Sequence, residues 1–269
     1  MRNEPEGAEL SPEDQETIEA SRAPLMAHIS ELQVRARAGC LGVFLCLVFC
    51  LASYEFFYEL LTAPLYDALT ALGLEPTVKF RTVQGVFIFQ LKSAFLGAIF
   101  FAAPWLFYQL WLFVAPGLYR RERRISLLFV LCTTLFFFTG GVFCYKAVIP
   151  FSFEFFLSYA RADGPYPLLP DITLEDYMNF VTRLLIAAAL IFETPIILAF
   201  FTWTEVLTYQ TLVRGWRWAV FSSFVIAALL TPPDYITQIL LALPLISFYG
   251  LSLVFAKLIE SRRDQRSGD

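Results

Sequence analysis

Three glutamates lie where a carboxylate could bind a cationic ligand or a partner protein. Glu193 interrupts the apolar run IAAALIFETPIILAF, Glu122 stands among four arginines in LYRRERR, and Glu31 closely follows His28 in LMAHISELQVRAR. Because a carboxylate can accept two hydrogen bonds from one guanidinium group, Glu31 and Glu122 could bind arginine side chains of a ligand. Ionisable groups inside apolar segments are costly to bury and usually functional, so Glu193 is also a candidate site residue.

Each of these carboxylates also has a purely structural interpretation. Glu122 could do no more than neutralise the arginines beside it. Glu31 could pair with Arg35, one helical turn further on, in the solvated face of an interfacial anchor. Glu193 could be protonated and hydrogen-bonded inside a helix bundle. The sequence by itself leaves both interpretations open for all three.

The surroundings of Glu193 favour a polar notch inside a membrane span. Arg183 cannot simply neutralise it, because ten residues of one helix separate the two by roughly 15 Å and about 80° of rotation. Pro195 lacks the backbone N–H that would bond the carbonyl of Ile191, so we expect an interrupted helix there. Glu193 and Pro195 are therefore predicted to form one intramembrane polar site.

The remaining residue types argue against an enzyme. His28 is the only histidine, which excludes a His-rich metal site, and it lies before the first apolar run. The five cysteines lie in apolar runs without a CxxC pair and are predicted to pack as small hydrophobes. HExxH and nucleotide-binding loops are absent from the sequence. We therefore expect no catalytic residue, no cofactor, no metal and no nucleic-acid partner.

The elements that must position these residues are membrane-spanning helices. The chain is 58% hydrophobic and 16% charged, with a mean hydropathy of +0.61, far more apolar than a water-soluble domain. A bilayer core of roughly 30 Å needs about 20 apolar residues of helix. Six segments satisfy this, near residues 38–57, 88–111, 125–147, 178–203, 215–231 and 236–256. The predicted fold class is all-α, a polytopic membrane protein with six transmembrane helices.

The distribution of Lys and Arg predicts the orientation of the spans. Most of these residues lie in the two tails and in the connections between spans 2 and 3 and between spans 4 and 5. Because positive charge near span ends is retained in the cytoplasm, both termini are predicted to be cytoplasmic. Residues 1–24 are acidic and lack the apolar core of a signal peptide, so we expect a disordered cytoplasmic tail. Residues 259–269 are the second predicted tail.

The domain between these tails, residues 25–258, should carry further short helices. Leu25, Ile29, Leu32 and Ala36 recur at helical spacing, which predicts an amphipathic helix along the membrane surface with its polar residues facing water or headgroups. The connections 58–87 and 148–177 are long enough to hold short amphipathic elements. Spans 5 and 6 must form a tight hairpin. A secondary transporter is the alternative interpretation, but only Glu193 is convincingly deep among the ionisable groups.

Four motifs in order resemble the TatC family, the C subunit of the Sec-independent twin-arginine protein translocase. They are His28-x-x-Glu31-Leu32, the stretch from Pro104 to Arg124, Phe192-Glu193-x-Pro195, and Leu230-Thr231-Pro232-Pro233-Asp234 continuing to Gln238, Ala242 and Pro244. Ala63-Pro64-Leu65, Phe87 with Lys92, and Asp176-Tyr177 are supporting matches. The chain departs from the family pattern at Gln33, where Arg is usual, and at Tyr249-Gly250, where an acidic residue is usual.

The resemblance implies a receptor in the bacterial inner membrane for export signals that carry two consecutive arginines. The expected signal-peptide site comprises Glu31, Phe113, Glu122, His28 and Arg124, and the expected partner-docking site comprises Glu193 and Pro195. Pro64, Pro116, Asp234 and Gln238 are expected to have structural roles or to lie on the far side, and an N-cap of span 6 explains Asp234 equally well. The implied partners are single-span subunits of the TatA and TatB type, signal peptides of folded export substrates, membrane lipid and further copies of the chain. Transport would be driven by proton motive force.

Overall fold

The computed structural model describes residues 12–114, 123–160, 170–231 and 235–267, of which 12–25, 27, 123–126 and 262–267 are placed by backbone alone. In these ranges the chain is almost entirely helical. Its pairing of extended backbone there is limited to an isolated bridge between Lys79 and Thr173. The all-α prediction is therefore confirmed.

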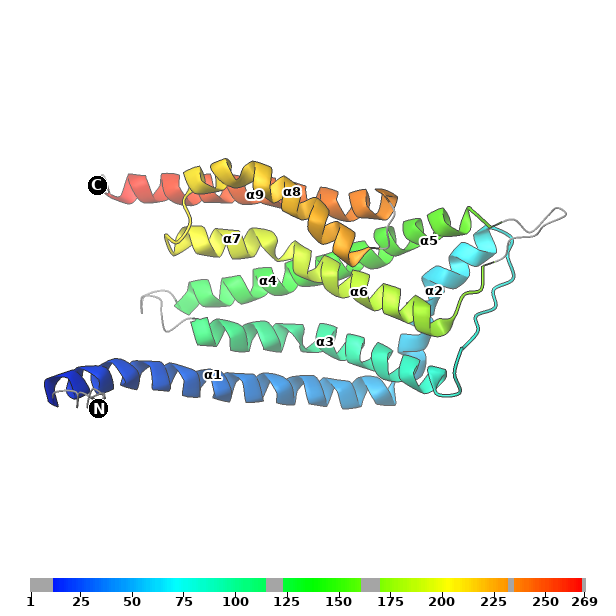
Figure 1. Ribbon diagram of the computed structural model, residues 1–269, viewed down its shortest axis with the longest axis horizontal. Coiled ribbons are helices and arrows are strands. Elements are labelled where there is room, and N and C mark those ends of the chain that lie inside the picture. Colours follow the sequence, from blue (N-terminus) through cyan, green and yellow to red (C-terminus); the bar gives the residue numbers. More distant parts are fainter. Residues whose placement is uncertain (1–11, 115–122, 161–169, 232–234, 268–269) are drawn as a thin grey trace, which may run out of the picture.

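All six predicted membrane spans are present. Six described helical stretches are long and apolar enough to cross a bilayer: His28–Ala52, Gly85–Val114, Leu127–Leu157, Leu174–Trp203, Tyr209–Leu230 and Tyr235–Ser261. They belong to α1 (Pro12–Ala52), α3 (Gly85–Val114), α4 (Arg123–Phe143) with α5 (Ile149–Leu157), α6 (Leu174–Phe192) with α7 (Thr194–Trp203), α8 (Tyr209–Leu230) and α9 (Tyr235–Ser267). A π-helical turn, Cys144–Val148, joins α4 to α5 without a break. The remaining helix, α2 (Tyr54–Ala71), lies across one end of the bundle (Figure 1).

The two ends of the bundle differ. The described parts of both tails extend from the same end, here called the terminal face, together with the connection between α7 and α8 (Figure 1). The opposite end, here called the distal face, carries α2, α5 and residues 72–84. The short elements expected in the two long connections are thus present as α2 and α5.

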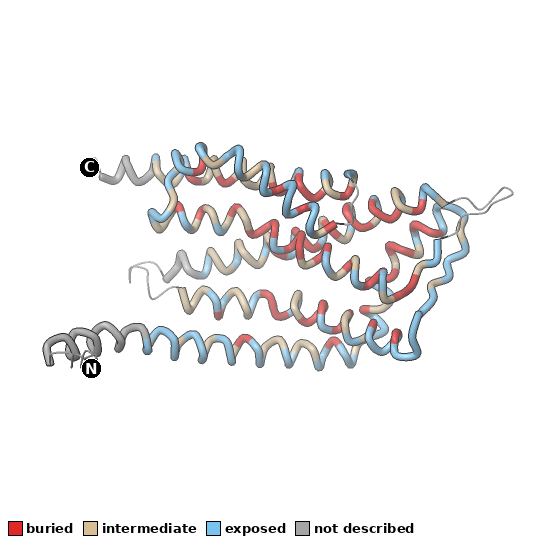
Figure 2. The backbone as a smooth tube through the Cα atoms, viewed as in Figure 1, coloured by how far each residue is buried: buried red, intermediate tan, exposed pale blue. Residues whose placement is uncertain are grey.

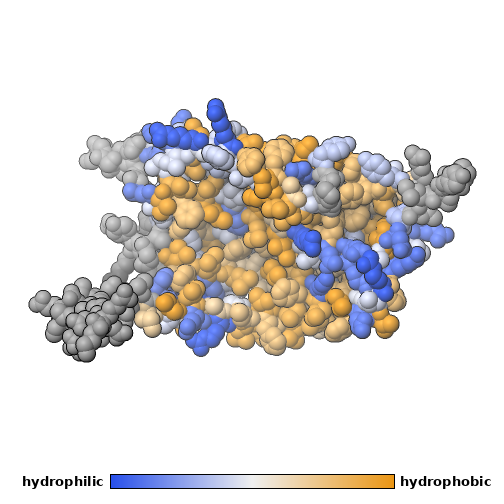
Figure 3. Space-filling view, in the orientation of Figure 1, coloured by the Kyte–Doolittle hydropathy of each residue, from blue (hydrophilic) through white to orange (hydrophobic). Residues whose placement is uncertain are grey.

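The core of the bundle is centred on α6. Half of the residues in the apolar stretch of α6 and α7 are buried, whereas only 11% are buried in the apolar stretch of α1 and 17% in that of α8 (Figure 2). The main core cluster joins residues of α6, such as Met178 and Leu184, to α2, α3, α5 and α9. Between the two ends, the exposed surface is mainly hydrophobic (Figure 3), as contact with lipid tails requires.

Close packing of α4 on α6 depends on a glycine. A Cβ added at Gly140 would lie 2.7 Å from the carbonyl oxygen of Ala188 and 2.9 Å from Cα of Ala189, both backbone atoms. A residue larger than glycine at position 140 would therefore hold α4 and α6 apart. Small residues at such crossings let backbones approach and gain dispersion contacts, which drive helix association in lipid where the hydrophobic effect cannot.

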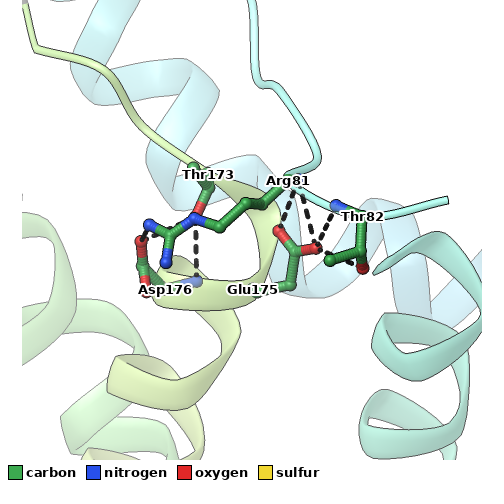
Figure 4. A network of polar contacts seen from close by, with 5 residues as sticks. All are labelled: Arg81, Thr82, Thr173, Glu175 and Asp176. Carbon is green, nitrogen blue, oxygen red and sulfur yellow. Dashed lines mark hydrogen bonds and ion pairs between the residues drawn. The ribbon is translucent and has the colours of Figure 1, made fainter. Parts of the chain in front are cut away.

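A polar network ties the two long connections together at the distal face (Figure 4). The Arg81 guanidinium donates to Asp176 Oδ2 at 2.8 Å, and the Thr173 hydroxyl donates to the same oxygen at 2.7 Å. The Glu175 carboxylate accepts the backbone N–H groups of Arg81 at 3.2 Å and Thr82 at 3.4 Å. The start of α6 is thereby fixed to the segment that leads into α3.

The structure differs from the sequence predictions in the tails and in the first span. α1 begins at Pro12 and α9 continues to Ser267, so helix extends into stretches expected to be tails, including one expected to be disordered. The segment before the first span does not form a separate surface helix but continues directly into that span. The first span also ends earlier than predicted, at Ala52 rather than near residue 57, because α2 starts at Tyr54. Local periodicity identifies a helical face but not whether two helical stretches are continuous.

We predict that Gly140→Ala lowers the free energy of unfolding by about 1–3 kcal/mol, the usual cost of overpacking a tight contact. The measurement is thermal or denaturant unfolding of the purified protein in detergent, followed by tryptophan fluorescence. Gly250→Ala is the matched control, because a Cβ at that helical position would meet its nearest neighbour only at 3.9 Å. Equal stability of the two variants would contradict the packing described here.

Candidate functional site

The membrane-spanning part of α1 packs along α3, and this contact positions the first predicted site. The imidazole of His28 stacks on the ring of Phe113, with centroids 4.4 Å apart and an angle of 22° between the planes. Further into the bilayer, the indole Nε1 of Trp105 donates to the carbonyl of Ala38 at 2.9 Å. A Cβ at Gly42 would lie only 2.3 Å from the Trp105 ring, so a larger residue there would displace this ring. Two of the predicted signal-peptide residues are thus in direct contact.

Glu31 lies on the side of α1 that faces α3. Glu31 and Arg35 are half-buried, and Gly39, one turn further, is buried, whereas Ile29 and Leu32 are exposed. The expectation that Glu31 and Arg35 face water or headgroups is therefore corrected in part, because both side chains are half-buried. The apolar residues point outward because lipid accepts them, and the carboxylate and guanidinium are shielded by the neighbouring helix.

The predicted pair between Glu31 and Arg35 is present but weak. Arg35 Nη2 lies 3.4 Å from Glu31 Oε1, at the long end of a hydrogen bond. Among the described residues, Glu31 Oε2 has no partner and Arg35 Nε is buried without one. The carboxylate therefore has an oxygen available for a second guanidinium.

The rest of the predicted peptide site lies partly outside the described residues. Glu122 and Pro116 fall in residues 115–122, which the structure does not describe, and Asp234 falls in a second such segment, 232–234. Arg124 is placed by its backbone in the first turn of α4. The ends of the two helices that flank the undescribed segment, α3 at Val114 and α4 at Arg123, both lie at the terminal face with Phe113 (Figure 1).

Glu193 occupies a break in the fourth span, as predicted. Glu193 is the single residue between α6 and α7, and Pro195 lies buried in the first turn of α7. Glu193 is only 4% exposed. Neither of its carboxylate oxygens has a hydrogen-bond partner among the described residues. The backbone of Phe137 in α4 lies near the carboxyl but not in hydrogen-bonding geometry, so the interpretation of a protonated Glu hydrogen-bonded inside the bundle stays a prediction.

Aromatic rings surround the residue that precedes this break. Phe192 contacts Phe248 of α9 at a centroid distance of 4.4 Å and Phe143 of α4 at 5.5 Å. Glu193 therefore belongs to the core between α4, α6–α7 and α9, whereas Glu31 belongs to the α1–α3 pair. The predicted residues form two separate sites, one at the terminal face and one within the membrane.

Two other predicted residues have structural contacts. Gln238 Nε2 donates to the carbonyl of Phe224 at 3.1 Å, which joins α9 to α8 beside the hairpin. Pro64 is buried inside α2, where it lacks the N–H that would bond the carbonyl of Leu60, and this carbonyl accepts the hydroxyl of Tyr145 instead. The structural roles expected for Gln238 and Pro64 stay predictions.

Sequence reasoning missed several polar contacts that the fold creates. The bond from Trp105 to α1 and the network around Glu175 join residues far apart in the chain, and no spacing rule predicts them. A local signal existed only for Thr173, three residues before Asp176, in the pattern of an N-cap. The bond from Lys92 to Asn179, 2.5 Å long, was likewise missed.

Comparison with known proteins identifies the family. The sequence model of the Sec-independent protein translocase protein (TatC) family matches residues 27–244. The TatC protein of Magnetococcus marinus is 34% identical over 245 residues, which cover 91% of this chain and 88% of that protein. The TatC protein of Campylobacter jejuni is 32% identical over 245 residues, which cover 91% of this chain and 98% of its own.

A solved structure has the same fold. The crystal structure of the twin-arginine translocase receptor TatC superposes with a TM-score of 0.74 and 26% sequence identity, covering 87% of this chain and 99% of that one. The chain therefore belongs to the TatC family of Sec-independent protein translocase proteins, multi-pass proteins of the inner membrane that are not enzymes.

Proposed function

We propose that this chain is the receptor subunit of the twin-arginine translocase. In this proposal it binds signal peptides with two consecutive arginines at its terminal face, which lies in the cytoplasm. It also holds single-span subunits of the TatA and TatB type for export of folded proteins driven by proton motive force. The observation that carries the proposal is the half-buried Glu31 on the α3 side of α1, with one carboxylate oxygen that has no partner among the described residues.

The geometry around Glu31 suits an incoming guanidinium group. Arg35 contacts a single carboxylate oxygen at 3.4 Å, whereas a bidentate arginine makes two shorter bonds of about 2.7–2.9 Å. A signal-peptide arginine can therefore displace Arg35 with a gain in bonding. The shielding by α3 strengthens such a pair relative to bulk water. Glu122 would bind the second arginine.

The stacked rings of His28 and Phe113 add a second feature to the peptide site. They lie one turn before Glu31 on α1 and at the end of α3, respectively. The faces of such rings attract cations and pack against apolar side chains. The peptide residues next to the arginine pair would contact this surface, and the apolar part of the signal would lie against the bundle.

Glu193 supports the proposed docking of partner subunits. A buried carboxyl group without a hydrogen-bond partner is unfavourable in the isolated subunit. A polar side chain on the membrane helix of a partner would supply the missing bond, and the helix break at Pro195 leaves backbone groups that a partner could also satisfy. Assembly at this position would then be favoured because it satisfies the buried carboxyl.

The receptor proposal predicts selective binding of twin arginines. A labelled twin-arginine signal peptide should bind the purified protein in nanodiscs about tenfold or more tightly than its twin-lysine version, because Lys cannot form the bidentate pair. Glu31→Gln and Glu122→Ala should each weaken arginine-peptide binding by about 10–100-fold, the value of a charge-assisted hydrogen bond. Fluorescence anisotropy measures all of these affinities.

Two further variants sharpen this experiment. Glu59→Gln, which removes an exposed carboxylate from α2 at the distal face, should leave peptide binding unchanged. Arg35→Gln removes the competing guanidinium and should strengthen binding. Equal affinity for both peptides in folded protein would contradict the receptor proposal and favour a transporter of small solutes.

The docking proposal predicts opposite effects of Glu193→Met on stability and on assembly. Met fills a similar volume without a buried polar group, so the free energy of unfolding of the isolated subunit should rise by about 1–3 kcal/mol. Retention of the single-span subunits during co-purification should fall. Glu154→Gln, at an exposed site on α5, should change neither quantity. A Met variant that is less stable and still retains its partners would overturn the assignment.

A further inference from the structure

A groove between α3 and α6 opens on the lipid-facing surface toward the distal face. Its volume is about 510 Å³, and it is lined by Leu91, Lys92, Phe95, Asn179, Thr182 and Arg183. Residues 91, 92 and 95 share one face of α3, and 179, 182 and 183 share one face of α6. The two helices are in contact, so the groove is a feature of the fixed bundle rather than of a loop.

This groove contains two cations and no acid. Lys92 Nζ donates to Asn179 Oδ1 at 2.5 Å, which satisfies one of its three donors. Arg183 is exposed and makes no hydrogen bond or ion pair with the described residues. Two positive charges without a counter-charge are unfavourable inside a membrane unless an anion accompanies them.

The nearest acidic residues on α6 are already engaged elsewhere. Asp176 pairs with Arg81 at 2.8 Å, and Glu175 accepts backbone N–H groups of Arg81 and Thr82 (Figure 4). Both belong to the network that ties the distal connections together. Neither lines the groove with Lys92 and Arg183.

The backbones of the two cationic residues lie just inside the hydrocarbon core, from where their long side chains reach the phosphate level of a bilayer. The spans that begin at Gly85 and Leu174 each have 30 residues. At about 1.5 Å per residue each is roughly 45 Å long, about 15 Å more than the hydrocarbon core. A centred span therefore leaves about 7 Å in each headgroup zone. Lys92 and Arg183 lie roughly 10 and 13 Å from the span starts, and long side chains at such depths extend back to the interface.

We propose that this groove binds the phosphate of an anionic phospholipid in the leaflet at the distal face. Arg183 offers a planar pair of donors that matches phosphate oxygens, and Lys92 adds a second charge. The walls formed by Leu91 and Phe95 would contact the first part of an acyl chain. A net anionic headgroup is favoured because a zwitterionic one brings an ammonium group toward the two cations. This proposal does not depend on the receptor function.

The experiment measures how far added lipid stabilises the purified full chain against thermal unfolding in detergent. Added phosphatidylglycerol should raise the melting temperature of the wild type more than added phosphatidylcholine does. Native mass spectrometry should show retained phosphatidylglycerol. Lys92→Gln and Arg183→Gln should each weaken the apparent affinity for phosphatidylglycerol about tenfold, and the double variant should lose the preference between the two lipids.

The control is Lys146→Gln, which removes an exposed cation near the distal face outside the groove and should keep the lipid preference. The single variants keep the test decisive if the double variant does not fold. Undiminished preference for phosphatidylglycerol in both single variants would overturn the proposal. Equal protection by inorganic phosphate would assign the groove to a free anion instead. Loss of partner subunits from the variants, with lipid binding unchanged, would assign it to an acidic group on a partner helix.

Discussion

A bilayer offers no water to polar groups, so each must find its partner within the protein, and this constraint accounts for most of the structure. Backbone groups are satisfied by continuing helices, even where α4 passes into α5 through the turn Cys144–Val148. The irregular backbone of residues 72–84 lies at the distal face, where Glu175 accepts two of its N–H groups. Among the described residues, buried polar atoms without a partner occur in Arg35, Gln109, Trp111, Thr134, Thr182 and Glu193, and three of these residues, Arg35, Thr182 and Glu193, belong to the candidate sites.

The unpartnered polar groups at the two intramembrane sites differ in how far they are buried. Glu193 is buried in the core with neither oxygen partnered among the described residues, so only a molecule that packs closely on the bundle could satisfy it. Arg183 is exposed at the lipid-facing surface, where a mobile anion can reach it. Burial thus favours a protein partner for the carboxyl, and exposure favours a lipid for the guanidinium.

Much of the fold can be predicted from properties that depend only on the order of residues along the chain. The apolar run lengths place all six spans, because thickness of the bilayer sets helix length. The break at Glu193 follows from Pro195, since a missing N–H interrupts the helix in any context. The extent of α1 and α9 does not follow, because the sequence does not show whether a polar segment continues an adjoining apolar helix. The same limit explains the partly incorrect orientation predicted for Glu31 and Arg35.

By itself, the sequence determined the class of protein, the positions of the spans and the identity of the acidic residues at the two candidate sites. Composition and residue type act locally, so their consequences can be predicted without knowing the tertiary structure. Only the tertiary structure decided which faces of α1 and α6 meet α3, and hence that His28 stacks on Phe113 and that Lys92 and Arg183 line one groove. Such contacts join residues tens of positions apart, and helix rotation and close approach at Gly42 and Gly140 set them.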